Sequence, residues 1–261
     1  MYVERAVTTV TLGDRAISRI GLGTNRLRHT PEHVAFVRAA VNAGVRMIDT
    51  AHLYTQGESE TTIGAALSPV PDGCIVATKG GYGGPGRGRP EVLRQEIHES
   101  LARLRTERIE LYYLHRVDPE TPIEESLGTI KEFVERGHIA HVGISEVTVA
   151  QIDEARRVLP IAAVQNNYSL AERKHDAVVD YCASAGIAFV PFFPMKGADG
   201  PRVRAIAARH DATPAQIALA WLLRRSPVML PIPGTLSTAH LEENLSAMSI
   251  ALSDDEFEAL Q

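Results

Sequence analysis

The sequence predicts an α/β fold, namely a (β/α)₈ TIM barrel with an N-terminal β-hairpin that caps the bottom of the barrel. Short β-branched runs alternate with longer amphipathic stretches, which is typical of parallel strands joined by helices. Eight such runs occur, and at about 30 residues per strand–helix unit they need about 240 residues. Because the chain has 261 residues and no low-complexity linker, we expect a single domain over residues 1–261. An open, doubly wound sheet is the structural alternative.

The predicted hairpin precedes the first barrel strand. Val7–Leu12 and Ala16–Ile20 are two apolar-alternating runs, and Gly13-Asp14-Arg15 lies between them. A Gly-Asp pair between such runs is typical of a tight turn.

The predicted barrel elements follow in order. The strands are Ile20–Thr24, Val45–Asp49, Cys74–Thr78, Ile109–Leu114, Ile139–Gly143, Ala162–Gln165, Ile187–Pro191 and Val228–Pro231. Helical spacing of apolar residues lies between them, most clearly over Pro90–Leu104, Val203–Arg209, Pro214–Leu222 and Ser253–Leu260. Thr213 is an N-cap candidate for the third of these helices. Gly44, Gly137 and Gly186 are typical of helix C-termini before a strand.

Composition excludes several classes of protein. Hydrophobic residues make up 44% and charged residues 23%, which excludes a disordered or collagen-like chain. The net charge of −5 lacks the basic excess of a nucleic-acid or anionic-membrane binder. No apolar run approaches the roughly 20 residues of a membrane span, and the N-terminus has no signal-peptide pattern. Cys74 and Cys182 have no metal or redox spacing, so we expect a cytoplasmic protein. No pattern predicts its oligomeric state.

Glycine motifs do not predict a Rossmann-type dinucleotide site. Gly21-Leu22-Gly23 lacks the third glycine of G-x-G-x-x-G. Gly81–Gly86 matches that spacing, but Arg87–Pro90 separates it from the next predicted helix, where a pyrophosphate should bind. We interpret Gly81–Gly86 as a loop at the barrel mouth, where Tyr82 would contact substrate.

Four chemistry-bearing residues lie at the ends of consecutive predicted strands. Asp49, Lys79 and His115 each end or directly follow a strand, and Tyr54 comes five residues after Asp49. Singly, the residues have ordinary structural explanations: Asp49 as a helix cap, Lys79 as a solvated charge and His115 as a core histidine. In a barrel, however, the C-terminal ends of the strands share one rim. Together the four residues therefore predict an active site.

These side chains suit proton transfer to a developing alkoxide. A tyrosine hydroxyl ordinarily has a pKa of about 10, and a neighbouring ammonium favours the tyrosinate. We expect Tyr54 to be the general acid, assisted by Lys79, which Asp49 keeps charged. His115 would donate a hydrogen bond to the carbonyl oxygen of the substrate. None of these groups delivers a hydride, so a nicotinamide cofactor is implied.

Several motifs are similar to those of a known enzyme family. They are Asp49-Thr50-Ala51-His52-Leu53-Tyr54, Gly57-Glu58-Ser59-Glu60, Ile63-Gly64-Ala65-Ala66-Leu67, Ala77-Thr78-Lys79, Leu114-His115-Arg116-Val117-Asp118 and Val142-Gly143-Ile144-Ser145. Through them the chain resembles the aldo-keto reductase family over essentially its whole length. The resemblance implies a (β/α)₈ barrel, NADPH-dependent carbonyl reduction, and Asp49, Tyr54, Lys79 and His115 as the catalytic tetrad.

The resemblance also implies a nicotinamide site. Ser145, Glu146 and Gln165 match the positions that hold the carboxamide, but Glu146 replaces the usual Asn, and a carboxylate accepts hydrogen bonds without donating them. Phe192 matches the aromatic residue that stacks on the nicotinamide ring, and core packing is its alternative role. Gly23-Thr24-Asn25 matches a cofactor edge, with Asn25 in place of an aromatic residue.

The segment from Pro231 to Asn244 resembles the part of the family that binds the adenosine phosphate. The matching positions are Gly234, Thr235 and Ser237 for a phosphate near a helix start, and Glu243 and Asn244 for the adenine. His240 stands where many members have an Arg that braces the 2′-phosphate. Because histidine is mostly neutral at pH 7, we predict NADPH with a reduced margin over NADH.

Substrate contacts are expected from the loops at the mouth. Leu53, Tyr82 and Arg116 are the candidates, together with Arg26–His29 and Met195-Lys196. The basic residues among them favour an anionic carbonyl compound or are ordinary solvated charges. The segment after Met195 is short, which predicts an open mouth and broad aldehyde specificity.

Two other functions remain open. One is a non-catalytic, NADPH-binding sensor or auxiliary subunit with the same fold. The other is a metal-dependent hydrolase or isomerase that uses Asp49, His52 and His115, but no H-x-H or H-E-x-x-H spacing supports a metal site.

Overall fold

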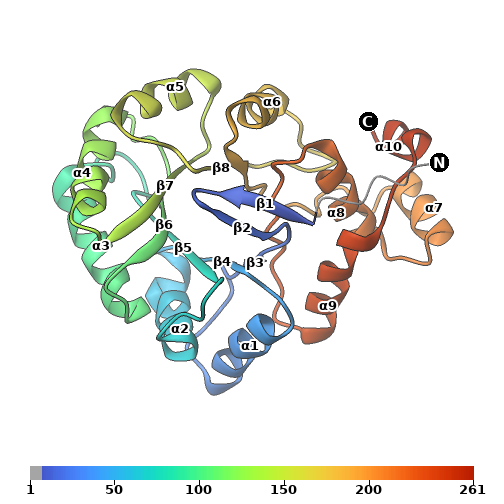
Figure 1. Cartoon of the computed structure of the whole chain (residues 1–261), viewed down its shortest axis with the longest axis horizontal. Coiled ribbons are helices and arrows are strands. Elements are labelled where there is room, and N and C mark those ends of the chain that lie inside the picture. Colours follow the sequence, from blue (N-terminus) through green and yellow to red (C-terminus); the bar gives the residue numbers. More distant parts are fainter. Residues whose placement is uncertain (1–7) are drawn as a thin grey trace.

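The computed structural model describes residues 8–261 as a ring of parallel strands inside a layer of helices (Figure 1). Seven strands pair in chain order: β3 (Leu22–Gly23), β4 (Met47–Asp49), β5 (Ile75–Gly80), β6 (Ile109–Leu114), β7 (Ile139–Ser145), β8 (Ala163–Gln165) and β9 (Ala188–Phe189). Every pair in this sheet is parallel. A doubly wound sheet would reverse its strand order part-way, so this sequential order confirms the predicted barrel.

The predicted eighth strand, Val228–Pro231, is the exception, because this segment is not a regular strand. It forms an isolated parallel bridge to β9 at Met229 instead, and the chain just beyond it forms another to β3 at Gly234. Backbone hydrogen bonds still run to both sides: Leu230 donates to Phe189 of β9 at 2.8 Å, and the Pro231 carbonyl accepts from Gly21, directly before β3, at 3.0 Å. Proline has no N–H, so the prolines at 231 and 233 interrupt a continuous ladder. The prediction of a strand was wrong here, but the segment closes the ring.

Helices alternate with the strands and cover the outside of the ring. They are α1 (Pro31–Asn42), α2 (Glu58–Leu67), α3 (Pro90–Leu104), α4 (Ile123–Glu135), α5 (Val149–Val158), α6 (Asp176–Ala185), α7 (Pro201–Arg209), α8 (Pro214–Arg225), α9 (Thr238–Ser246) and α10 (Asp254–Ala259). The largest apolar cluster lies between these helices and the strands. Thr213 caps α8 through a capping box with Gln216. Gly44, Gly137 and Gly186 all have positive φ, as predicted for chain reversal after a helix.

The N-terminal hairpin closes one end of the barrel. β1 (Thr9–Leu12) and β2 (Arg15–Ser18) are antiparallel, with the turn at Gly13 and Asp14. Leu12 and Ile17 are buried with Met47 and Ile75, which begin β4 and β5, so the hairpin lies over the N-terminal ends of the strands.

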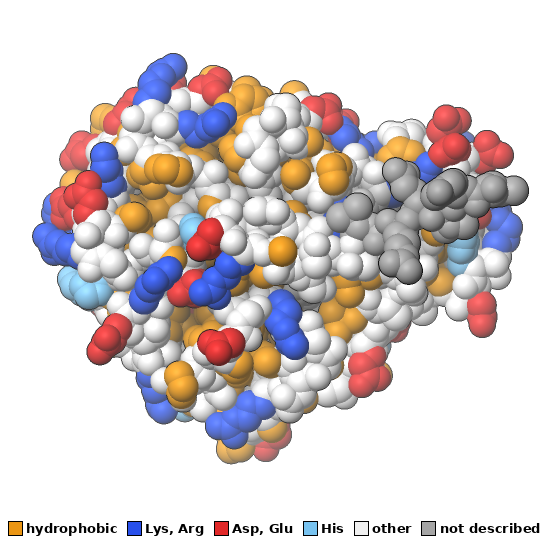
Figure 2. Space-filling model, in the orientation of Figure 1, with side chains coloured by type: hydrophobic (Ala, Val, Ile, Leu, Met, Phe, Trp, Pro, Cys, Tyr) orange, Lys and Arg blue, Asp and Glu red, His pale blue; other side chains and the backbone are white. Residues whose placement is uncertain are grey.

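Figure 1 shows the hairpin crossing the centre of the ring. The hairpin prediction is confirmed, although Val7 lies outside the described residues and the second strand ends at Ser18 rather than Ile20. On this face, Lys and Arg side chains are interspersed with Asp and Glu (Figure 2). Within residues 8–261, no helix is long and apolar enough to cross a membrane.

Candidate active site

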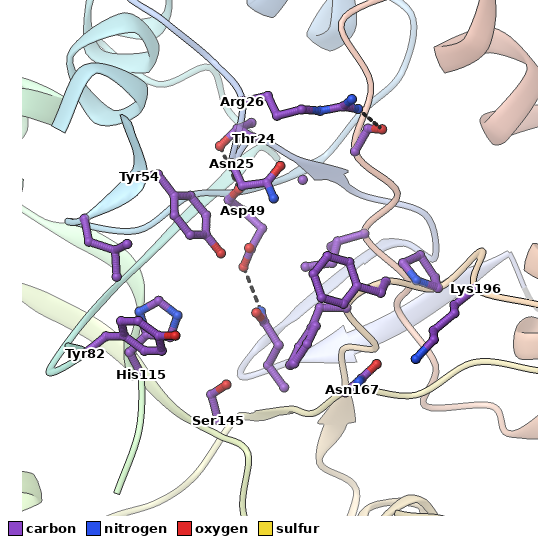
Figure 3. A pocket seen from close by; sticks show the side chains of 18 of the residues that line it. Thr24, Asn25, Arg26, Asp49, Tyr54, Tyr82, His115, Ser145, Asn167 and Lys196 are labelled. Atoms are coloured by element: carbon purple, nitrogen blue, oxygen red, sulfur yellow. Dashed lines mark hydrogen bonds between the residues drawn. The ribbon is translucent and has the colours of Figure 1, made fainter. Parts of the chain in front are cut away.

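A cavity of about 910 Å³ lies at the end of the barrel opposite the hairpin. Its walls come from the C-terminal ends of the strands and the loops that follow. The lining residues are Gly23, Thr24, Asn25, Arg26, Asp49, Leu53, Tyr54, Tyr82, His115, Arg116, Ser145, Gln165, Asn167, Phe192, Phe193, Pro194, Met195, Lys196, Ile232 and Gly234. Figure 3 shows Tyr54 and His115 facing the same space.

Lys79 and Asp49 form an ion pair at the base of this cavity. Lys79 Nζ lies 2.5 Å from Asp49 Oδ1 and donates to the Thr50 carbonyl at 2.7 Å. Both side chains are buried. Burial alone would lower the pKa of Lys79, but the charges of Asp49 and Tyr54 outweigh it and raise the pKa. The ammonium is therefore retained beneath the cavity.

Tyr54 begins the short 3₁₀ turn η1 (Tyr54–Gly57), which directs its ring toward the ion pair. Lys79 Nζ lies 5.0 Å from the centre of the Tyr54 ring. Thr55 and Gln56 have φ values of 47° and 58°, a left-handed conformation that costs non-glycine residues energy. Thr55 Oγ1 donates to the Leu27 carbonyl at 2.6 Å, which helps hold this turn.

His115 directly follows β6 and is buried beside Tyr54. The two rings meet edge to face, with their centres 6.1 Å apart. Burial, assisted by the charges of Lys79 and Arg116, lowers the pKa of His115 to about 2, so the imidazole is neutral at physiological pH. Nδ1 is buried with no partner among residues 8–261, which leaves Nε2 as the ring nitrogen available to a ligand.

Gln165, at the end of β8, is oriented by the same carboxylate that holds Lys79. Its Nε2 donates to Asp49 Oδ2 at 2.8 Å, the dashed line from Asp49 in Figure 3. Because a carboxylate only accepts, this bond leaves the Gln165 carbonyl oxygen free to accept from a ligand. Ser145, at the end of β7, accepts from Arg116 at 2.9 Å and keeps its own proton to donate.

Four of the remaining residues expected near the nicotinamide line the cavity, but their side chains do not all face a ligand. Phe192, Gly23 and Asn25 line the cavity. Thr24 also lines it, but its hydroxyl donates to the Asp49 carbonyl and contacts Ser59, so its side chain mainly supports the strand ends.

Glu146 is not among the residues that line the cavity. Asn167 donates its backbone N–H to Glu146 Oε1 at 2.6 Å, and Lys174 and His175 lie within ion-pair distance of the carboxylate. The neighbouring His175 imidazole, 3.6 Å away, is the main cause that lowers the pKa of Glu146 to about 2. The side chain is therefore committed to the loop that carries His175.

The predicted adenosine-phosphate segment lies next to the cavity at the start of α9. Gly234 reaches the cavity wall, and Ser237 caps α9 by accepting the His240 backbone N–H. Glu243 accepts a hydrogen bond from Thr213, a residue of the α8 capping box. Of the positions predicted to bind the adenosine phosphate, those that do not line the cavity are Thr235, Ser237, His240, Glu243 and Asn244.

The three predicted substrate residues, Leu53, Tyr82 and Arg116, all line the cavity. Leu53 is 39% exposed and Tyr82 43% exposed, which suits residues that contact an entering molecule. Lining residues that sequence reasoning missed are Asn167, Phe193, Pro194 and Ile232. Asn167 had a usable signal, because it stands two residues after Gln165 and strand alternation puts both on one side.

The described residues contain no group of three or more His, Cys, Asp or Glu side chains arranged to hold a metal ion. His52 instead pairs with Glu99 at 2.7 Å, on the outer side of the barrel wall at α3.

Comparisons with known proteins agree with this architecture. The family model described as "Aldo/keto reductase family" matches residues 19–200 and 197–261. An uncharacterized oxidoreductase of Schizosaccharomyces pombe is 40% identical over 97% of this chain and 88% of its own length. Pyridoxine 4-dehydrogenase of Escherichia coli is 36% identical over 95% of each chain. A crystal structure of an aldo/keto reductase from Klebsiella pneumoniae, in complex with NADP and acetate, has a TM-score of 0.87 and 27% identity, covering 97% of this chain and 94% of that one.

Proposed function

Because this chain belongs to the aldo/keto reductase family of oxidoreductases, we propose that it reduces an aldehyde or ketone to an alcohol with NADPH as hydride donor. The observation that carries the proposal is the convergence of Tyr54, the Lys79–Asp49 pair and a neutral His115 on one cavity. The Klebsiella relative, crystallised with NADP, supports the choice of cofactor. We propose that residues 1–261 act as one domain.

In the proposed mechanism, Tyr54 is the general acid. It protonates the alkoxide oxygen that forms as the carbonyl is reduced, and the nearby Lys79 ammonium stabilises the tyrosinate left behind. Asp49 keeps Lys79 charged and in place. Neutral His115 orients the carbonyl by donating through Nε2, with its proton on that nitrogen. When bound, the cofactor supplies the hydride.

The residues present fit a nicotinamide cofactor. The Ser145 hydroxyl can donate to the carboxamide oxygen, while the Gln165 carbonyl accepts from the carboxamide nitrogen. Phe192 offers a ring face at the same cavity wall. Arg26, Lys196 and the start of α9 would hold the phosphates, with Thr235, Ser237, His240, Glu243 and Asn244 toward the adenosine. Glu146 would act on this site only indirectly, through the backbone of Asn167.

A carbonyl screen that follows NADPH consumption tests this function. Small aromatic and aliphatic aldehydes form the panel, and pyridoxal joins it because the E. coli relative is a pyridoxine dehydrogenase. We expect several aldehydes to turn over, since Leu53 and Tyr82 leave the mouth open. Turnover of a single compound would contradict broad specificity.

Replacing the general acid provides the sharper test. We expect Tyr54→Phe to lower kcat by about 10² to 10⁴-fold, because the ring is kept and only the acidic hydroxyl is removed. NADPH binding, followed by fluorescence titration, should change little. Tyr181→Phe is the matched control, since Tyr181 pairs with Arg156 and Asp153 on the surface. Undiminished activity in Tyr54→Phe would refute the mechanism. Tight NADPH binding by the wild type without reduction of any carbonyl would favour the sensor alternative.

A further inference from the structure

Arg116 places a guanidinium in the cavity wall without a carboxylate partner. It follows His115 directly after β6 and is half-buried. Within residues 8–261 its hydrogen bonds go to neutral groups, the His115 carbonyl at 2.5 Å and Ser145 Oγ at 2.9 Å. Both bonds use Nη1, so Nε and Nη2 remain available among the described residues. A guanidinium with two free donor nitrogens in a cavity wall can form charge-assisted hydrogen bonds to an anionic ligand.

Neighbouring rings hold this guanidinium in one orientation. Its central carbon lies 5.2 Å from the Tyr82 ring centre and 5.8 Å from the Phe192 ring centre. Two aromatic faces and two hydrogen bonds restrict the side chain, so little further entropy is lost when an anion binds. The arrangement is that of a preorganised anion receptor.

The other cations of the cavity lie elsewhere. Figure 3 places Arg26 and Lys196 away from Tyr82 and His115. Arg26 also donates to the Gly234 carbonyl, next to the start of α9. The cofactor phosphates proposed for that side account for Arg26 and Lys196. Arg116 instead directly follows His115, against which the reacting carbonyl is expected, and it donates to Ser145 beside the proposed carboxamide site.

We propose that Arg116 makes the enzyme prefer, among the aldehydes it reduces, carbonyl substrates that carry a carboxylate remote from the carbonyl. The carbonyl lies against Tyr54 and His115 while the carboxylate binds Nε and Nη2 of Arg116. This inference rests on the proposed reductase function and adds its substrate class. It also gives Arg116 a role in substrate binding, in place of the alternative that it is an ordinary solvated charge.

The approach of the carboxylate is restricted to one side. A second cavity of about 560 Å³ shares Tyr82 and Arg116 with the first, but Asp118 lines it. Asp118 is an acid held by the backbone N–H groups of Gly86 and Gly88. An anion in that cavity would meet the Asp118 carboxylate. In the main cavity the only lining acid is Asp49, which is already paired with Lys79.

The test uses isosteric substrate pairs that differ only in charge. The 2-, 3- and 4-carboxybenzaldehydes are compared with the corresponding carbamoylbenzaldehydes, and the ratio of their kcat/KM values is measured in wild type, Arg116→Gln and Arg116→Lys. For at least one ring position we expect a wild-type ratio of about 10 or more, as for a charge-assisted hydrogen bond. Arg116→Gln should lower that ratio at least about tenfold, and Arg116→Lys should restore part of it. A ratio near 1 in the wild type, or one that changes less than twofold in Arg116→Gln, would overturn the proposal.

Controls separate this proposal from the function on which it rests. Unsubstituted benzaldehyde reports carbonyl reduction itself, so its failure would count against the reductase and not against Arg116. Binding of the carboxy- and carbamoyl-benzyl alcohols to the NADP⁺ complex, measured by calorimetry, then still tests the anion preference. Lys196→Gln is the matched charge control: it should weaken NADPH binding and leave the carboxylate-to-amide ratio within about twofold. A change of that ratio equal to the change in Arg116→Gln would assign the preference to the general field of the cavity.

Discussion

Asp49 shows how one side chain organises the site. Its two oxygens accept from Lys79 and from Gln165, so the ammonium beside Tyr54 and the amide expected to hold the carboxamide share one carboxylate. The positions of Asp49, Tyr54, Lys79 and His115 were predictable, because each is tied to a strand end by a few residues of local sequence. The bond to Gln165 was not, because it joins residues 116 positions apart and depends on how the barrel closes.

The neutral state of His115 leads to a prediction about pH. The pKa of its imidazole falls from 6.5 to about 2 in the folded protein. Below pH 6.5 the unfolded chain binds a proton at His115 that the folded chain does not bind, so the free energy of unfolding decreases as pH falls from about 6.5 toward 2. We expect His115→Gln to show a shallower decrease between about pH 7 and pH 4 in urea denaturation. The same slope in both proteins would contradict the buried, neutral histidine.

At the scale of elements, the sequence motif at the start of α9 predicted which positions form the segment, but not the hydrogen bonds that their side chains make. Matching positions predicted a phosphate site at Gly234, Thr235 and Ser237, and the structure adds that two of the hydroxyls already accept backbone hydrogen bonds. These caps depend on the local backbone conformation, which residue identity alone does not specify. Similarly, the predicted strand at 228–231 failed because the prolines at 231 and 233 remove ladder donors.

The same element sets the expected cofactor preference. His240 is exposed in the first turn of α9, and its imidazole lacks the permanently charged fork of an arginine, so we expect it to add little attraction for a 2′-phosphate. We expect NADPH to bind more tightly than NADH by less than about a thousandfold, and His240→Arg to widen the margin about tenfold through a charge-assisted contact. Fluorescence titrations with both cofactors measure this margin. A wild-type preference of a thousandfold or more would refute the expectation.

At the scale of the whole molecule, the barrel was predictable because its evidence is periodic and repeated. Each strand and helix carries its own local signal, and the sequential order follows from the strand–helix alternation. The hairpin was likewise signalled by its Gly-Asp turn and alternating residues. What the sequence could not specify was how Leu12 and Ile17 meet Met47 and Ile75, since these contacts require the finished ring.

A substitution in the hairpin should therefore weaken the whole barrel. Leu12 is fully buried beneath the strands, and we expect Leu12→Ala to lower the free energy of unfolding by about 2–5 kcal/mol through lost burial and a cavity. Thr11→Ala, on the exposed side of the same strand, should change it by about 0.5 kcal/mol or less. Guanidinium denaturation measures both. Equal effects would show that the hairpin does not complete the core.

The bond between Asp49 and Gln165 has a consequence for how the enzyme tolerates change. β4 and β8 lie on opposite sides of the ring, so this hydrogen bond connects the two sides across the inside of the barrel. A substitution that makes the ring wider or more oval would change the distance between Asp49 and Gln165, and with it the alignment of the proposed proton donor and the proposed cofactor site. Mutations far from the mouth can cost activity while the fold remains intact.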